Sequence, residues 1–356
     1  MPPVCVLKSH RLCHNRNVEM PHRGSRKCTA GQAKQQTIVC SACKPVTTLP
    51  NGLTVCYASK YDVSFLYREI FEEQLYLQQG VRLEQGDTVV DVGGNIGFFA
   101  LFAAQQVGPS GQVVSAEPIP TLHEKLSYNI KSHQMWCAAQ GIPAASITPI
   151  LAGVGSGQQQ TMEFTFYTAA AGWSTMYPDD EEVQGAMQVF LERALSGLQG
   201  IDSSMLTSAG QLLQSIAPNW VTRRIERLFV QNMLQQQEKH VCSMITVSEI
   251  MQKHELQHIS LLKIDVERAE LDVLAGVSLS DWQRISQLVM EVHDVQDRLQ
   301  QITKLLKHDA GFTSVKVTQD EQLKGSTIYN IYCCRQQQHL NRSNTTQNTK
   351  IVTASD

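Results

Sequence analysis

The sequence predicts an α/β fold in which a mostly parallel sheet is covered by helices on both faces. Two observations support this prediction. Short strand patterns alternate with helical patterns from residue 87 onward, and a glycine-rich turn joins the first of these strands to its helix. The chain has 356 residues, of which 42% are hydrophobic, so it can bury one large core. In such folds, ligands bind at the carboxyl ends of the strands.

The expected elements are short and follow one another closely, apart from one long insertion. A turn and an edge strand at "NGLTVCYA", from residue 51, precede apolar residues at helical spacing between 63 and 75. The insertion, residues 168–240, is rich in Gln, Ser, Gly and Met. The remaining elements are strands at 87–92, 111–117, 146–155, 161–167, 242–247, 259–266, 287–292 and 326–334, and helices at 97–106, 119–130, 183–198, 221–234 and 295–306.

The two ends of the chain differ in composition from the folded domain expected at 49–335. Residues 1–48 contain eight Lys or Arg residues and one acid, Glu19, without the apolar stretch of a secretory signal. This bias predicts import into a plastid or mitochondrion; a disordered tail or a misassigned start is the alternative, and the protein would then be cytoplasmic. Residues 336–356 are polar, and we expect them to be disordered.

Charge and hydropathy exclude several partners. The net charge is -3 and the basic residues are scattered, which argues against nucleic acid. The longest apolar run, 96–104, is far shorter than the roughly 20 residues that span a bilayer, so no membrane span is expected. A small molecule is the expected partner, and the oligomeric state stays open.

The stretch "DVGGNIG", residues 91–97, joins the first predicted strand of the sheet to its helix. Gly93, Gly94 and Gly97 allow a tight turn against a ligand, and Asn95 tolerates a positive φ. Amide groups at the start of the following helix can bind an anionic group. Any tight strand-to-helix turn favours glycine, however, so the loop alone does not establish a ligand site.

Two acids near this loop indicate which ligand it binds. Glu117 ends the next strand, 20 residues after Gly97, where a carboxylate can accept both hydrogen bonds of a ribose diol. Asp91 precedes the glycines and would repel the pyrophosphate of NAD, whereas it would attract an ammonium group. S-adenosylmethionine has a ribose diol, an amino acid end and no phosphate. It is therefore the predicted cofactor.

Four segments, "DVGGNIGFFALF", "AEPIP", "LLKIDVERAELDVLAGV" and "VMEVHD", together resemble the FkbM family of S-adenosylmethionine-dependent methyltransferases. Flanking segments resemble the subgroup associated with polyketide and nonribosomal peptide assembly lines, and the resemblance covers about residues 50–334. It implies a class I methyltransferase fold with a seven-stranded sheet. Two positions depart from the family pattern, since Gly94 stands where Ala is usual and Arg268 where Gly is common. The implied cofactor positions are Asp91, Gly93, Gly94, Asn95, Gly97 and Glu117.

The resemblance also implies that Asp265, Glu267 and His293 line the methyl-transfer side. His293 is the candidate base that removes the acceptor's proton, because an imidazole titrates near neutral pH. A structural histidine is the alternative, and Glu267 could merely charge the first turn of the next helix. Asp265, Glu291 and His293 could hold Mg²⁺, but no spacing requires it and we expect no metal.

The predicted function is methylation of a hydroxyl on a small molecule, such as a sugar or a polyketide-like acceptor. Trp173, Met176 and Tyr177 of "GWSTMYP" are the expected acceptor pocket, although packing of a helical cap would use the same residues. An NAD-dependent oxidoreductase and a non-catalytic nucleotide-binding module on the same fold are the alternatives.

Overall fold

A computed structural model describes residues 44–58, 60–178, 185, 219–321 and 323–335. Most of the basic leader, nearly all of the expected helix at 183–198 and the polar tail lie outside the described residues. The described residues belong to one compact unit, residues 41–356.

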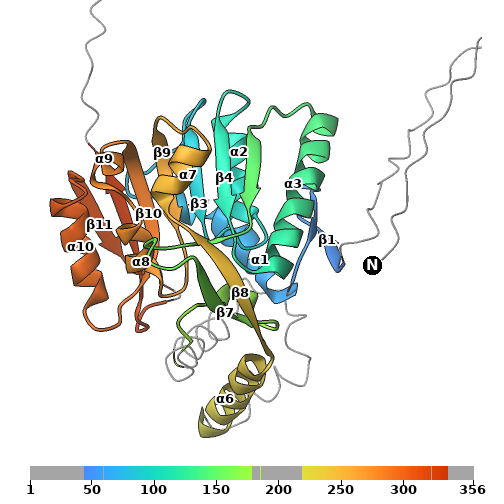
Figure 1. The fold of residues 1–356 in the computed structure, drawn as a ribbon. Helices are drawn as coiled ribbons and strands as arrows, with labels where there is room; N and C mark the ends of the chain where they lie inside the picture. Colours follow the sequence, from blue (N-terminus) through green and yellow to red (C-terminus); the bar gives the residue numbers. More distant parts are fainter. Residues whose placement is uncertain (1–43, 59, 179–184, 186–218, 322, 336–356) are drawn as a thin grey trace, which may run out of the picture. The chain divides into compact units, whose positions relative to one another are not determined.

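A seven-stranded sheet forms the centre of this unit, with the strand order β11-β12-β10-β9-β3-β4-β5 (Figure 1). Six strands run parallel, and β12 is antiparallel to both of its neighbours. The predicted α/β class is therefore confirmed. The strands are β3 (Thr88–Val92), β4 (Gln112–Ala116), β5 (Ser146–Ile150), β9 (Ile259–Ile264), β10 (Ile285–His293), β11 (Ser314–Thr318) and β12 (Ile328–Cys334).

Alternation along the strands divides the core into two layers, because successive side chains point to opposite faces of the sheet. Val89 of β3 packs with the apolar residues of the helices on one face, and its neighbour Val90 packs with those on the other. The first face carries α1 (Lys60–Tyr67), α2 (Phe98–Val107) and α3 (Pro120–Gln140). The second carries α7 (Val247–Lys253), α8 (Glu270–Ala275), α9 (Leu279–Trp282) and α10 (Arg298–His308).

A separate three-stranded sheet, in the order β6-β8-β7, lies between β5 and β9 in the sequence. It contains β6 (Gly153–Val154), β7 (Thr161–Tyr167) and β8 (Gln237–Ile245), and α6 (Asn219–Gln235) extends beyond it (Figure 1). The strand predicted at 146–155 is therefore two strands in two sheets. Gly153 permits the second pairing, because a Cβ there would lie 2.7 Å from both Met244 Sδ and the Phe164 ring.

The N-terminal elements also differ in detail from the sequence pattern. β1 (Val46–Thr48) and β2 (Thr54–Cys56) pair as the expected hairpin. The helix expected over 63–75 is α1, followed by a π-helical turn η1 (Arg68–Glu72) and a 3₁₀ turn η2 (Leu75–Leu77). π-helical turns often occur at functional sites, and this one carries Glu69 toward the sheet's carboxyl edge.

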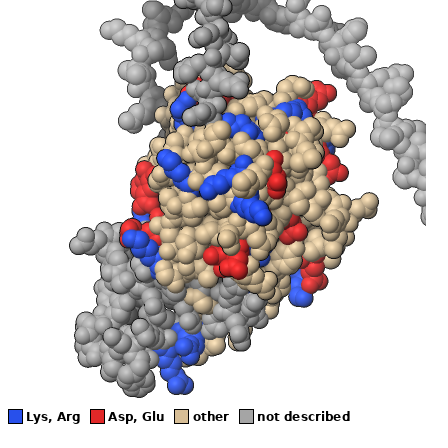
Figure 2. Space-filling view, turned by 90° about the vertical axis from the view of Figure 1, so that its left-hand side faces the viewer, with Lys and Arg blue, Asp and Glu red and all other residues tan. Residues whose placement is uncertain are grey.

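Helix hydropathy and surface charge bear on whether the described residues contact a membrane or a nucleic acid. No helix of the described chain is both long enough and apolar enough to cross a membrane. On the face in Figure 2, basic and acidic side chains are interspersed among neutral ones. The expected absence of a nucleic-acid partner stays a prediction.

Candidate active site

A cavity of about 70 Å³ lies at the carboxyl ends of β3, β4 and β9. The loops that follow these three strands line it, as expected for an open α/β sheet. Phe164 of the three-stranded sheet, Ala171 of the 3₁₀ turn η3 (Ala171–Trp173) and Met176, which follows that turn, contribute to its wall. The cavity therefore lies between the main sheet and the segment inserted after β5.

The glycine turn after β3 has the conformation that its sequence predicts. Gly93, Asn95 and Gly97 have φ values of +79°, +49° and +94°. A Cβ on Gly93 would lie 1.7 Å from the Asp265 carbonyl oxygen, so no other residue fits without displacing that loop. A Cβ on Gly94 would lie 2.2 Å from Ser115 Oγ. The serine hydroxyl therefore explains why glycine replaces the usual alanine here.

Glu117 lies at one end of the cavity and is fixed by backbone amides. Its Oε2 accepts a hydrogen bond from Asn95 N and its Oε1 accepts one from Ile119 N, both at 2.8 Å. Burial raises the pKa of Glu117 to about 7, against the lowering effect of these two hydrogen bonds. The carboxylate is thus oriented, and each of its oxygens retains acceptor capacity toward the cavity.

Asp91 does not line the cavity, which contradicts its expected contact with a ligand. The side chain is fully buried, accepts a hydrogen bond from Ser115 Oγ at 2.7 Å and pairs with Lys263 Nζ at 3.2 Å. A buried carboxylate requires such compensation, because its charge is poorly solvated. Asp91 therefore lies beside the glycine turn and stabilises it, and the ion pair with Lys263 compensates its charge.

Lys263 connects the two halves of the site. Its ammonium donates to the Gly93 carbonyl at 3.0 Å and lies 3.3 Å from Asp265 Oδ2, which also accepts a hydrogen bond from Tyr76 Oη at 3.0 Å. Burial alone would lower the pKa of Lys263, but Asp91 and Asp265 outweigh it and raise the pKa. This lysine was not predicted from the sequence, although a single lysine within the apolar strand "ISLLKI" is a recognisable signal.

His293 is buried at the end of β10 and lies between two glutamates. Its Nδ1 lies 3.0 Å from Glu270 Oε1, and its Nε2 lies 3.1 Å from Glu267 Oε2. Burial lowers the pKa of His293, but the two carboxylates outweigh it and raise the pKa well above its ordinary value. Both ring nitrogens face carboxylate oxygens, so neither is directed at a proton of an acceptor in the cavity. The geometry therefore does not support the general-base role that we expected.

Glu270 fixes the orientation of that imidazole. It is fully buried, its Oε2 accepts a hydrogen bond from Arg298 Nη1 at 2.9 Å, and its Oε1 accepts bonds from the backbone amides of Arg268 and His293 at 3.1 Å. The pKa of Glu270 is lowered, because hydrogen bonds and charges from His293 and Arg298 exceed the effect of burial. Glu270 therefore anchors the loop after β9 in addition to charging the start of α8.

Two further carboxylates, Glu69 and Glu291, lie near Asp265. Glu69 extends from the π-helical turn. Burial raises its pKa to about 8, and the negative charge of Asp265 adds to this increase. Burial and the charge of Asp265 raise the pKa of Glu291 well above its ordinary value. Glu267, Glu291 and His293 place one potential ligand atom each within 4.8 Å of the others. This end of the cavity is strongly acidic.

Of the three residues expected to form an acceptor pocket, only Met176 lines the cavity. Trp173 packs against the apolar cluster that Tyr167 and Leu234 form between β7 and α6. The Tyr177 hydroxyl donates to Asp272 Oδ2 at 2.9 Å, and the side chain is 41% exposed. Trp173 therefore contacts the cluster beside α6 and Tyr177 contacts α8, so neither lines this cavity, and their role in an acceptor pocket stays a prediction.

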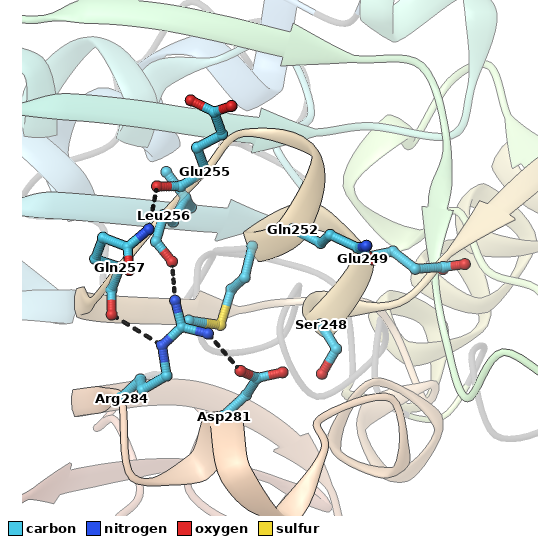
Figure 3. Close-up of a pocket in the computed structure, with 9 residues that line it drawn as sticks. Ser248, Glu249, Gln252, Glu255, Leu256, Gln257, Asp281 and Arg284 are labelled. Atoms are coloured by element: carbon cyan, nitrogen blue, oxygen red, sulfur yellow. Dashed lines mark hydrogen bonds and ion pairs between the residues drawn. The ribbon is translucent and has the colours of Figure 1, made fainter.

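A larger hollow of about 630 Å³ lies where β9 and β10 begin (Figure 3). Its one cation, Arg284, donates to the carbonyls of Leu256 and Gln257 and to Asp281 Oδ1. These bonds join two turns and use three of the five N–H donors of the guanidinium. We interpret this hollow as a structural junction.

The strand order, with β12 antiparallel between β10 and β11, and the acids at the carboxyl ends of β4 and β9 define a class I methyltransferase. A family model described as "Methyltransferase FkbM domain" matches residues 199–314, and a model of protein-L-isoaspartate(D-aspartate) O-methyltransferase matches residues 73–169. The chain belongs to the FkbM family of S-adenosylmethionine-dependent methyltransferases, because it is 34% identical over 283 residues to a curated member.

That relative is the 31-O-demethyl-FK506 methyltransferase FkbM of Streptomyces tacrolimicus; the match covers 80% of this chain and 94% of the relative. The AMB antimetabolite synthetase AmbE of Pseudomonas aeruginosa is 28% identical over 81% of this chain, which corresponds to 12% of AmbE. Among solved structures, the FkbM methyltransferase of Methylobacillus flagellatus is 12% identical, with a TM-score of 0.40 over 78% of this chain and 56% of that one.

Proposed function

We propose that the protein transfers the methyl group of S-adenosylmethionine to a hydroxyl oxygen of a small molecule, such as a sugar or a polyketide-like compound. The arrangement of the cavity carries this proposal, since Glu117 lies at one end and Asp265 with Glu267 at the other. The name of the Streptomyces relative, a 31-O-demethyl-FK506 methyltransferase, supports oxygen as the acceptor atom.

The cofactor would lie across the ends of β3 and β4. Glu117 would accept the hydrogen bonds of the ribose diol, and the methionine end would extend toward the loop after β9, where Asp265 is exposed to the cavity. Asp265 thereby takes the role that the sequence suggested for Asp91. Small-molecule sites usually measure roughly 300 Å³ or more, so Phe164 and Met176 would move aside on binding.

Methyl transfer would then proceed by in-line displacement. The S–CH₃ bond breaks as the O–CH₃ bond forms, the sulfur keeps the bonding electron pair, and the hydroxyl proton passes to a carboxylate at the acidic end of the cavity. The protein contributes chiefly by positioning the two reactants and removing that proton.

Calorimetric titration of the full chain with S-adenosylhomocysteine and, separately, with NAD tests the choice of cofactor. We expect micromolar binding of S-adenosylhomocysteine and none of NAD. Binding of NAD alone would favour an oxidoreductase. A second assay follows transfer of a radiolabelled methyl group to a panel of hydroxylated sugars and macrolides, with amine analogues as controls. Transfer only to the amines would contradict the proposal, and cofactor binding without any transfer would favour a non-catalytic module.

A further inference from the structure

Three side chains from two neighbouring strands meet beside the cavity. Glu291 and His293 lie two residues apart on β10 and therefore point to the same face, and Glu267 lies in the loop after β9. Their potential ligand atoms are all within 4.8 Å of one another. We propose that Glu267, Glu291 and His293 bind a divalent transition-metal cation, with Mn²⁺ as the best match.

The orientation of His293 supports a ligand role. Glu270 accepts a hydrogen bond from Nδ1 at 3.0 Å and is itself bound by Arg298, which is how outer carboxylates fix metal-binding histidines. The imidazole is 4% exposed, and within the described part of the chain its Nε2 has no hydrogen-bond partner. Nε2 and Glu267 Oε2 lie 3.1 Å apart as an ion pair, so a cation that displaces the Nε2 proton would lie against both atoms. Both atoms could bind one ion.

The backbone that presents Glu267 is strained. Glu267 and Arg268 have φ values of +45° and +79°, in the region that side chains rarely adopt. The Thr175 hydroxyl donates to the Glu267 carbonyl, and Glu270 accepts a hydrogen bond from the Arg268 amide. Strain that neighbouring groups maintain in this way is typical of functional loops, and here it directs the Glu267 carboxylate toward His293.

The charges around the three ligands favour a cation. Among the ion pairs of the described residues, none joins a lysine or arginine to Glu267 or Glu291. Asp265 differs, because Lys263 and Tyr76 already occupy its Oδ2. It is therefore outside the ligand set, in contrast to the set of Asp265, Glu291 and His293 that the sequence suggested.

One imidazole nitrogen and two carboxylate oxygens select among metals. Mg²⁺ and Ca²⁺ prefer ligand sets made of oxygen alone, and Zn²⁺ usually takes more nitrogen or sulfur, whereas Mn²⁺ accepts carboxylate-rich sets. Three protein ligands leave positions open. Glu267 lines the cavity, so these positions would be reached from the acceptor side.

The role of the ion rests on the proposed function. A hydroxyl bound to it would lose its proton more readily to a carboxylate of the acidic end that is not a ligand, and the resulting alkoxide would attack the methyl group while the sulfonium becomes a thioether. Binding of the metal itself does not depend on this chemistry and can be measured without a methyl donor.

Electron paramagnetic resonance of Mn²⁺ tests the proposal, because the signal of the free aqueous ion falls when protein binds it. We expect the metal-stripped full chain to bind one Mn²⁺, and His293→Ala and the near-isosteric Glu291→Gln to weaken binding by at least about tenfold. His308→Ala, at an exposed histidine of α10, and Glu163→Gln, at an exposed glutamate of β7, should bind Mn²⁺ as the wild type does.

Affinity for S-adenosylhomocysteine verifies that each variant is folded. Undiminished free signal with the wild-type chain, or equal losses in ligand and control variants, would overturn the proposal. Competition by Mg²⁺ or Ca²⁺ at a lower concentration than Mn²⁺ would overturn the choice of ion, because a histidine ligand should favour the transition metal. If Mn²⁺ binds as expected but no acceptor is methylated, the proposed function fails and the metal site stands.

Discussion

The main sheet has one edge at which its parallel strands begin and another at which they end, and these two edges carry hollows of opposite character. At the edge where β9 and β10 begin, a hollow of about 630 Å³ is bordered by Arg284, whose donors are bound to carbonyls and to Asp281. At the edge where the strands end, a cavity of about 70 Å³ is bordered by buried acids with few cations. In the proposed function the chemistry takes place in the smaller hollow, whose acids are buried, and not in the larger one, whose arginine is already paired. Four predictions test this difference, from the largest expected effect to the smallest.

Removal of the buried lysine should cost more stability than removal of the arginine at the other edge. Lys263→Met leaves Asp91 charged and unpaired in the core, which should lower the free energy of unfolding by about 3–5 kcal/mol. Arg284→Met removes hydrogen bonds of a side chain that is 36% exposed, and should cost about 1 kcal/mol. Urea unfolding measures both. Equal losses would remove the distinction between the edges, whereas Asp91→Asn in the Lys263→Met background should recover part of the stability.

Glutamates at the two edges should differ in their effect on cofactor binding. Glu117→Gln replaces an ionised acceptor, so affinity for S-adenosylhomocysteine should fall by about 100-fold, given roughly 1.5–3 kcal/mol for each charge-assisted hydrogen bond. Glu255→Gln, in the hollow of Figure 3, should leave that affinity unchanged. Calorimetry supplies both values. A similar loss in both variants would indicate a general effect on folding.

Cofactor affinity should also depend on pH through Glu117. Burial raises the pKa of this carboxyl to about 7, while Lys263 lowers it and Asp91 raises it. The ribose diol requires the ionised form, so affinity for S-adenosylhomocysteine should be about tenfold weaker at pH 6 than at pH 8. The raised pKa affects the free energy of unfolding in the opposite direction to cofactor affinity. The stability that protonated Glu117 contributes is fully present below the unfolded pKa near 4.5 and is lost as the pH rises through 7. A flat profile in Glu117→Gln assigns the effect to this residue.

The smallest expected effect concerns Arg268, whose φ is +79°. Both Arg268→Gly and Arg268→Ala lose the hydrogen bond from Nη1 to the Tyr177 carbonyl, but only glycine relieves the backbone strain. The glycine variant should therefore be more stable than the alanine variant by about 0.5–1 kcal/mol, the reverse of the usual order. Chemical denaturation resolves this difference. The opposite ranking would show that the loop is not strained.

Local patterns predicted the parts of the fold that depend on neighbours in the chain. The positive φ of Asn95 and the position of Glu117 at the end of β4 follow from a turn and a strand that the sequence shows directly. The pairing of Asp91 with Lys263 joins residues far apart in the chain, so the sequence does not reveal it. β11 was not predicted, because it has five residues, none of them fully buried, and lacks an apolar run.

The acceptor side was harder to predict for the same reason. A histidine can act as a base, which is why this role was expected for His293. Glu270, which contacts its imidazole, lies 23 residues earlier in the sequence, and the two residues meet only in the folded chain. Trp173 carries an aromatic group that either a pocket or a core can use, and the arrangement of β7 and α6 decides between them. Residue type therefore limited the possible roles, and tertiary contacts selected one.

The pairing of β6 with β8 places the start and the end of the inserted segment side by side, since Gly153 is paired with Met244 and Val154 with Ile245. A segment that leaves and re-enters a scaffold at adjacent points can be exchanged between homologues without lengthening the chain between them. A chimaera that replaces residues 155–243 would keep Glu117, Lys263 and His293 in their own strands and loops. Recombination of this segment is thus a route by which such enzymes could change one wall of the cavity, which Phe164 and Met176 line, while the residues at the strand ends stay constant.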